Sequence, residues 1–246
     1  MGERATQSDG RLASENAPAW QSLLNRIPSW LPVVLLLALL FGIAGIAANK
    51  FMKPVLPEDL DKYGLGHYGD FLQFHEGAKA LLAGEDIYLA YQKLYSYPPM
   101  LAILIAPLGY LHVSYAGVIW SFITAIIFFA LSMLSAKEIL RRFDVPTTLR
   151  NVGAVAFMGS LIMADKIRSE MRMGQCDGIV MLSLFWALTF IGRKPLIFGL
   201  LLGVATNVKY QGLIMLPYLL VRKRWVEAVS SVAWAVVIAL SSALVF

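Results

Sequence analysis

The chain has 246 residues, of which 58% are hydrophobic and 15% charged, and its mean hydropathy is +0.65. Because a soluble domain is about 45–50% apolar, this composition excludes an ordinary soluble protein and indicates an integral membrane protein. The net charge of +5 does not indicate nucleic-acid binding, since the basic residues cluster at the ends of apolar runs, as in the cytoplasmic loops of membrane proteins. The single cysteine, Cys176, excludes a disulfide within the chain and is interpreted as a small packing residue.

The N-terminal part is predicted to be a tail followed by one membrane span. Residues 1–28 are polar and mixed in charge, which predicts a disordered cytoplasmic tail. The apolar run behind them, from Trp30 to Asn49, is too long for the core of a signal peptide and is predicted to be the first span. We therefore expect a multi-pass protein of an inner or plasma membrane with a cytoplasmic N-terminus and one transmembrane domain over residues 29–246.

Residues 50–97 are predicted to form the first extracytoplasmic loop, and they hold seven of the sixteen acidic residues. Within this loop Phe71, Phe74 and Ala78 recur at helical spacing, with Leu81 and Leu82 on the same side. Polar side chains occupy the opposite face, which predicts a short amphipathic helix lying in the membrane interface. Gly84 is expected to end it.

Six to eight spanning or half-spanning helices fit in the chain at about 20 residues each, but the number of crossings in 98–136 stays open: two spans, or one re-entrant piece and one span. The stretch "DKIRSEMRMGQCD" is interpreted as a charged loop. Basic clusters at 193–194 and 222–224 enclose only about 27 residues, so we expect a broken hairpin there, with Asn207 and Lys209 at its turn. An ionisable residue at such depth is a functional candidate.

Three stretches of the sequence carry a family resemblance. They are "DFLQFHEGAKALLAGEDIY" with the following "YSYPPMLAILIAPLGYL", then "GQCDGIVMLSLFWAL", and then "GLLLGVATNVKYQGLIMLPYLLVRKRW". In this order they resemble the polytopic glycosyltransferases of the GT-C class and, among these, glycosyltransferase family 87, which includes mycobacterial polyprenol-phosphate-mannose-dependent mannosyltransferases. Where that family has "GQxN", this chain has Gly174-Gln175-Cys176-Asp177. Because family members are longer and the chain ends inside an apolar segment, we interpret it as a fragment, a truncated gene product or a shortened relative, incomplete at its C-terminus.

The resemblance implies an all-α transmembrane helical bundle that transfers a hexose, mannose above all, from a polyprenyl-phosphate donor to a lipid-linked or glycan acceptor on the outer face. It implies Asp70 as the catalytic base, and partial desolvation at the interface would raise the pKa of this carboxyl toward useful values. Lys209, Arg168 and Arg172 are candidate partners of the donor phosphate, because cations stabilise the departing charge. The remaining candidates for substrate binding are Gln175, Asp86, His75 and Tyr97. We expect no cofactor, no obligatory metal, and membrane lipids but no nucleic acid as partners.

Simpler explanations exist for most of these residues. Asp70 with Gln73 also fits an N-cap and its capping box, and Asp86 fits a turn. Lys209 also fits a lysine that reaches from a helix end toward water, while His67 and His75 flank Asp70 without the spacing of a metal site. Two other functions remain open: a transporter or flippase of lipid-linked intermediates, although no internal repeat is found, and an inactive membrane fragment.

Overall fold

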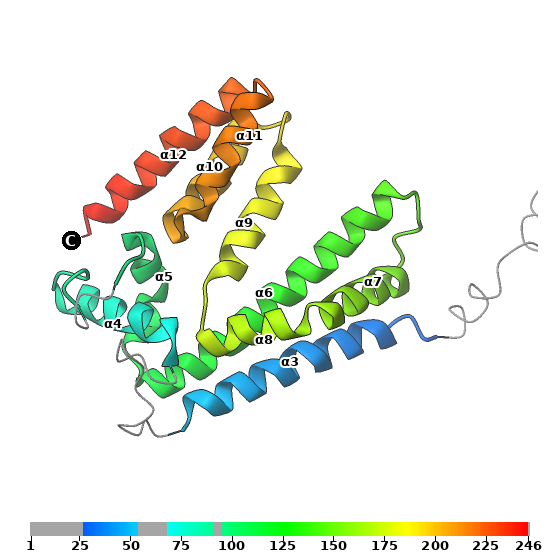
Figure 1. Ribbon diagram of the computed structural model, residues 1–246, viewed down its shortest axis with the longest axis horizontal. Helices are drawn as coiled ribbons and strands as arrows, with labels where there is room; N and C mark the ends of the chain where they lie inside the picture. Colours follow the sequence, from blue (N-terminus) through cyan, green and yellow to red (C-terminus); the bar gives the residue numbers. More distant parts are fainter. Residues whose placement is uncertain (1–26, 54–67, 91–94, 246) are drawn as a thin grey trace, which may run out of the picture.

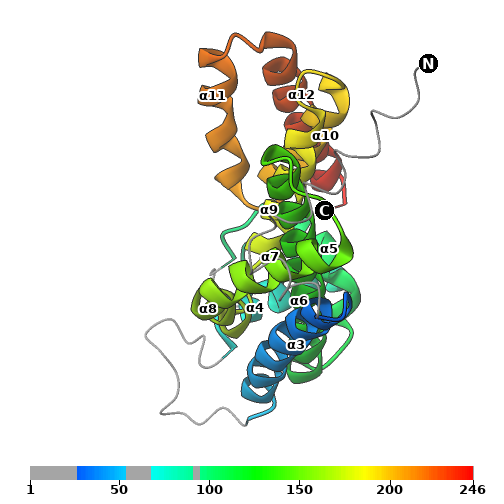
Figure 2. The same cartoon turned by 90° about the vertical axis from the view of Figure 1, so that its right-hand side faces the viewer.

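The computed structural model describes residues 27–53, 68–90 and 95–245, and every regular element within these ranges is helical (Figure 1). The predicted all-α fold is therefore confirmed. The predicted tail at 1–28, except for its last two residues, and His67 lie outside the described residues. The helices form two arms that meet at one end, where a short pair of helices covers the junction (Figures 1 and 2).

The first arm consists of α3 (Leu31–Phe51), α6 (Val113–Arg142), α7 (Leu149–Ile162) and α8 (Ala164–Met173). Helix α3 begins with Pro32 in its first turn, where the missing N–H costs nothing. Its buried residues Leu36, Leu40 and Ala44 follow one another at four-residue spacing and pack against α6. The ring of Phe51 lies against Gly117 near the start of α6, so the two long helices are antiparallel.

The second arm consists of α9 (Asp177–Phe190), α10 (Pro195–Val208), the 3-10 helix η4 (Tyr210–Ile214), α11 (Met215–Val221) and α12 (Trp225–Ala243). The turn between α9 and α10 lies against the turn between α11 and α12; these are the outer turns of the arm. The Glu227 carboxylate joins them, because it accepts the Gly192 N–H at 3.1 Å and an Arg224 N–H at 3.1 Å. The chain between these turns therefore goes out and comes back, which confirms the predicted broken hairpin with Lys209 at the break. Asn207 does not lie at the turn, because it belongs to the last turn of α10 and donates to the carbonyl of Gly203 at 2.9 Å. Figure 1 shows the reversal between α10 and α11.

Helices α4 (Asp70–Ala83) and α5 (Pro99–Gly109) cover the junction of the two arms. The core there combines Phe71 and Phe74 of α4 with Trp120 of α6 and Val208 of α10, all buried. The amphipathic helix predicted after the first span is thus confirmed, and Gly84 ends it with a φ of +70°. Leu82 does not join the buried face, since it is 38% exposed.

The structure resolves the arrangement left open for 98–136. Only the eleven-residue α5 precedes the 30-residue α6, so the stretch holds one short helix and one helix of spanning length. Since α6 starts beside the end of α3, the basic end of α6 lies at the same end of the first arm as the start of α3 (Figure 1).

Two predictions about local structure are wrong. The stretch interpreted as a charged loop is the helix α8, because Ile167, Glu170 and Met171 form one face that is buried in the first arm. Asp70 is not an N-cap: that position is Gly69, and the Asp70 carboxylate makes no capping hydrogen bond.

Three of the described helices, α3, α6 and α12, are long and apolar enough to cross a membrane, judged by length and composition. The other apolar helices are shorter: α5, α7, α9, α10 and the η4–α11 pair. Large apolar side chains stay exposed along the long helices, for example Ile46 at 61% and Leu240 at 63%. An apolar surface of this kind is stable in lipid and not in water.

The contact between α10 and α12 generates a stability prediction. A Cβ added at Gly199 would lie 2.7 Å from the backbone carbonyl carbon of Ser230, so Gly199→Ala must push the two helices apart. We expect a loss of about 1–3 kcal/mol in unfolding free energy, measured by thermal or denaturant unfolding in detergent. Gly42→Ala in α3 is the matched control, because a Cβ there meets nothing within 4 Å. Equal stability of the two variants would contradict the close packing of α10 on α12.

Candidate active site

Two glycines allow the start of α4 to touch the end of α8. Gly69 precedes α4 with a φ of +58°, and a Cβ on it would lie 2.8 Å from the carbonyl oxygen of Met173. Gly174 ends α8 with a φ of +66°, and a Cβ on it would collide with the side chain of Phe71. Only glycine fits both the backbone angles and the space. The next residue after each glycine, Asp70 and Gln175, is therefore brought face to face.

A chain of four polar side chains crosses the junction from one arm to the other. The Gln175 amide donates from Nε2 to Oδ2 of Asp70, and its Oε1 accepts a hydrogen bond of 3.3 Å from the Lys209 ammonium. Lys209 also forms an ion pair of 2.5 Å with Asp177. Because the amide donates at one end and accepts at the other, its orientation is fixed. We call Asp70, Gln175, Asp177 and Lys209 the junction cluster.

Lys209 reaches the cluster because the chain breaks there. Helix α10 ends at Val208, and Lys209 itself has extended backbone, with φ −155° and ψ 133°, before η4 begins. The break turns the side chain out of the helical ladder and toward the start of α9. The Lys209 side chain is 21% exposed and the Asp177 side chain is 15% exposed, so the ion pair is mostly but not fully enclosed.

The Asp70 carboxyl is half-buried, and burial is the main reason that its pKa is raised above the ordinary value. The nearby charge of Asp177 raises the pKa further, while the hydrogen bonds from Gln175 and Tyr97 and the charge of Lys209 act in the opposite direction. Both side-chain hydrogen bonds that the described residues donate to this carboxyl go to Oδ2. No side-chain hydrogen bond from the described residues goes to the other oxygen, Oδ1.

Aromatic side chains wall the cluster on the α5 side. The Tyr97 hydroxyl lies 3.5 Å from Oδ2 of Asp70, a long contact, and its ring packs edge-on against Phe74 with 4.7 Å between the ring centres. Burial and the neighbouring Asp70 charge raise the pKa of Tyr97, so its hydroxyl stays protonated and acts as a donor. The indole N–H of Trp120 donates to the carbonyl of Gly174 at 3.0 Å and fixes the other side of the cluster.

Three predicted site residues do not reach the cluster. Arg168 pairs with Asp165 at 3.7 Å on the outside of α8. Arg172 is exposed, and its backbone carbonyl accepts a hydrogen bond of 2.9 Å from Lys50. Asp86 accepts the backbone N–H of Tyr88 at 2.8 Å, as expected of a turn. Their predicted roles in substrate binding receive no support from these contacts.

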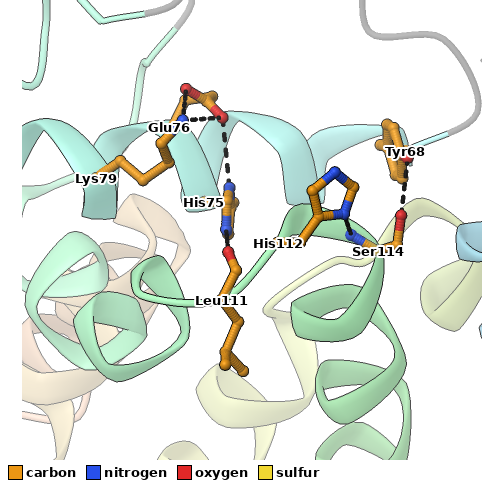
Figure 3. A network of polar contacts seen from close by, with 7 residues as sticks. All are labelled: Tyr68, His75, Glu76, Lys79, Leu111, His112 and Ser114. Carbon is orange, nitrogen blue, oxygen red and sulfur yellow. Dashed lines mark hydrogen bonds and ion pairs between the residues drawn. The ribbon is translucent and has the colours of Figure 1, made fainter.

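His75 serves as a tether between α4 and the corner before α6. Its imidazole is 2% exposed, and Nε2 lies 2.9 Å from the carbonyl oxygen of Leu111 (Figure 3). On the same helix, Glu76 lies beside Nδ1 of His75 and pairs with Lys79 at 3.2 Å. Figure 3 shows the imidazole pointing from α4 toward Leu111. This placement stabilises the helix that carries Asp70 and gives no support to a direct contact of His75 with substrate.

Sequence reasoning did not place Asp177 in the site, although it is the cluster's second carboxylate. The available signal was the aspartate at the fourth position of "GQCD", where the resembling family has asparagine. Cys176 beside it is buried in the junction core, and burial raises the pKa of its thiol to about 12, so it is unreactive and packs as predicted. Among the described residues, no three His, Cys, Asp or Glu side chains gather as a metal site would require.

Comparisons with known proteins place the chain among membrane glycosyltransferases. The model of glycosyltransferase family 87 matches residues 95–246. A polyprenol-phosphate-mannose-dependent alpha-(1-2)-phosphatidylinositol mannoside mannosyltransferase of Mycobacterium tuberculosis is 25% identical over 238 residues, which is 90% of this chain and 52% of that protein. The protein of the same description from Mycolicibacterium smegmatis is 31% identical over 158 residues, or 60% of this chain and 35% of that protein. The chain spans about half the length of the first of these relatives. No solved structure matches it significantly.

The charges in the cluster generate a prediction for Asp177→Asn. The change removes a negative charge that raises the pKa of Asp70 and releases Lys209 from its ion pair, so the pKa of Asp70 should fall. Infrared titration of the carboxylate bands, with Asp70→Asn used to assign its signal, measures this. Asp165→Asn, a change of the same type at an exposed position of α8, should leave the pKa of Asp70 as it is. An unchanged or raised pKa in Asp177→Asn would overturn this account of the electrostatics.

Proposed function

Because the chain belongs to glycosyltransferase family 87, we propose that it is a membrane-bound mannosyltransferase that takes its sugar from a polyprenyl phosphate and gives it to a lipid-linked acceptor. The two relatives carry this donor and a phosphatidylinositol mannoside acceptor in their descriptions. The observation that carries the proposal is the junction cluster: a half-buried carboxyl whose Oδ1 accepts no side-chain hydrogen bond from the described residues, linked through one amide to a lysine 3.3 Å from that amide.

The reaction needs a base for the acceptor hydroxyl. Oδ1 of Asp70 accepts the proton of that hydroxyl, whose oxygen forms a bond to the anomeric carbon of the sugar. The bond between this carbon and the phosphate oxygen breaks, and the polyprenyl phosphate leaves with the bonding electrons. The raised pKa makes the ionised Asp70 a stronger base than an ordinary carboxylate, because proton transfer improves as the two pKa values approach each other. Gln175 and Tyr97 donate hydrogen bonds to Oδ2 and so fix the orientation of the carboxylate, which also fixes the direction of the reactive oxygen, Oδ1.

The departing phosphate needs a partner for its growing negative charge. The Lys209 ammonium has three N–H donors, and among the described residues two of them have partners, Asp177 and Gln175. The third is open to a phosphate oxygen on the exposed side of the cluster. A donor already aimed at the leaving group costs no rearrangement during the reaction.

Cations at the far ends of the helices support an outer-face site and a cytoplasmic N-terminus. Arg141 lies 21 residues after Trp120 on α6, which is about 30 Å along a helix and equals the thickness of the hydrocarbon core. Arg193 and Arg224 lie likewise at the outer turns of the second arm, away from the cluster. Since basic loops favour the cytoplasmic side, the cluster belongs on the opposite side, in a multi-pass arrangement.

The proposal is tested by Asp70→Asn in the purified chain reconstituted in liposomes. With radiolabelled polyprenyl-phosphate mannose and a phosphatidylinositol mannoside acceptor, transfer should fall by about a hundredfold or more, because the base is lost. The raised pKa means that ionised Asp70 costs stability at neutral pH, so the variant should unfold at the same temperature as the original or above it.

Asp165→Asn is the matched control, since Asp165 is exposed on α8 and pairs only with Arg168 among the described residues. It should keep full transfer activity. A well-folded Asp70→Asn chain with full activity would eliminate Asp70 as the base. Label that moves across the bilayer while still attached to its polyprenyl phosphate would instead identify the chain as a flippase.

A further inference from the structure

A groove runs between the two arms on the side of α7 and α8. It has a volume of about 550 Å³ and is lined by α6, α7, α8 and α9. Its walls are mainly apolar, with Phe128, Leu131, Leu184 and Phe185 among them. Figure 1 shows α9 diverging from α6 as both leave the junction. Residues of both helices line the groove. Since α6 is long and apolar enough to cross a membrane, the groove lies at the depth of lipid chains.

One end of this groove is polar and incompletely satisfied. Glu170 lines it with a side chain that is only 6% exposed. Its Oε1 is paired with Lys166 at 2.7 Å, while its Oε2 is buried without a hydrogen-bond partner. A buried carboxylate oxygen without a partner is costly, and a ligand that donates a hydrogen bond would remove that cost.

The polar end of the groove leads to the junction cluster. Glu170 lies one turn before the end of α8, and its carbonyl accepts the backbone N–H of Gln175 at 3.0 Å. Lys166 lies one turn further from the cluster than Glu170 along α8.

Resting on the function proposed above, we infer that this groove binds the acceptor as a polyol phospholipid, with its hydrocarbon in the groove, its phosphate at Lys166 and a headgroup hydroxyl donating to Glu170. Along α8 the cation Lys166 comes before the acceptor Glu170. In a polyol phospholipid the phosphate likewise comes before the hydroxyl-bearing ring, counted from the hydrocarbon. Lys166 and Glu170 are four residues apart, about 6 Å along the helix, and Gln175 with Asp70 follows.

The groove lies some distance from the junction cluster, where the donor phosphate is proposed to bind. On α6 the groove begins at Phe128, eight residues or about 12 Å beyond Trp120, which contacts the end of α8 at the cluster. A donor has its phosphate on the reacting carbon, so that phosphate must lie at the cluster itself. An acceptor whose headgroup carries several sugars can span the interval. A polyprenyl chain in the groove would offer Glu170 no hydrogen-bond donor and would leave its Oε2 unpaired.

The test is a binding measurement that needs no turnover. The whole chain is placed in phosphatidylcholine nanodiscs with phosphatidylinositol bearing a photoreactive acyl chain, and labelled residues are mapped by mass spectrometry. We expect labels on the groove faces of α6 and α9 that unlabelled phosphatidylinositol displaces. Glu170→Gln, which weakens acceptance of the headgroup hydroxyl, should lower labelling by about tenfold.

A second variant fills the groove without touching the polar pair. Gly159 lines the groove, and a Cβ there meets nothing within 4 Å, so Gly159→Leu places its side chain in the space that the ligand would occupy. It should abolish the displaceable labelling. Gly45→Leu is the matched control on α3, because a Cβ at that position also meets nothing within 4 Å and Gly45 is exposed away from the groove.

Other outcomes would overturn the inference. If polyprenyl phosphate displaces the label as well as phosphatidylinositol does, the groove belongs to the donor lipid. If further phosphatidylcholine displaces it equally, the groove holds ordinary bilayer lipid. Displaceable labelling that Gly159→Leu leaves intact would place the lipid elsewhere. Specific labelling with no mannosyl transfer would reject the proposed function and support the lipid site. Mannosyl transfer without specific labelling would support the proposed function and reject the lipid site.

Discussion

The contact between the start of α4 and the end of α8 is the constraint on which the rest of the site depends. It exists because Gly69 and Gly174 both adopt positive φ angles and both lack the Cβ that would collide across the gap. Trp120 fixes the Gly174 carbonyl from a third helix. With the two backbones held this close, the side chains that follow the glycines must meet, and the cluster can form without a loop of its own.

Charge balance gives the cluster its chemical character. It contains two carboxylates and one ammonium, and Gln175 connects Asp70 to Lys209 without adding charge. Because Asp177 takes the ion pair with Lys209, the cation only partly offsets the burial of Asp70, whose pKa stays raised. A buried carboxyl with a raised pKa costs stability and gains basicity, which is the exchange that catalytic sites commonly show.

The two-arm architecture suits the proposed site at the boundary of lipid and water. Both arms start from the junction, and the cationic end of α6 lies about 30 Å along the helix from Trp120 at the cluster. The break at Lys209 also helps to form the site. If α10 continued as a regular helix, the Lys209 side chain would not be turned toward the start of α9. The groove between the arms then gives a hydrocarbon chain a path beside the cluster rather than across it.

Much of this protein was determined by its sequence alone. Apolar runs of spanning length predicted the all-α membrane fold, a three- to four-residue repeat predicted α4, and two basic clusters set too close for one crossing predicted the reversal at Lys209. Of the residues that the sequence offered as site candidates, Asp70, Gln175, Lys209 and Tyr97 lie together in the structure. These features depend on neighbours along the chain or on hydropathy, which a single sequence displays.

Only the tertiary structure decided which polar groups meet. The high charge of "DKIRSEMRMGQCD" indicated a loop. The segment forms the helix α8 because α3 and α6 bury its residues Ile167 and Met171. In the packed structure Arg168 lies on the outside of α8 and Glu170 lines the groove. His75 pairs with the backbone carbonyl of Leu111, which is 36 residues away in the sequence. Asp177 joined the cluster because α9 starts opposite the break in α10. Such pairings depend on distances between segments remote in sequence, and no local pattern of residues records them.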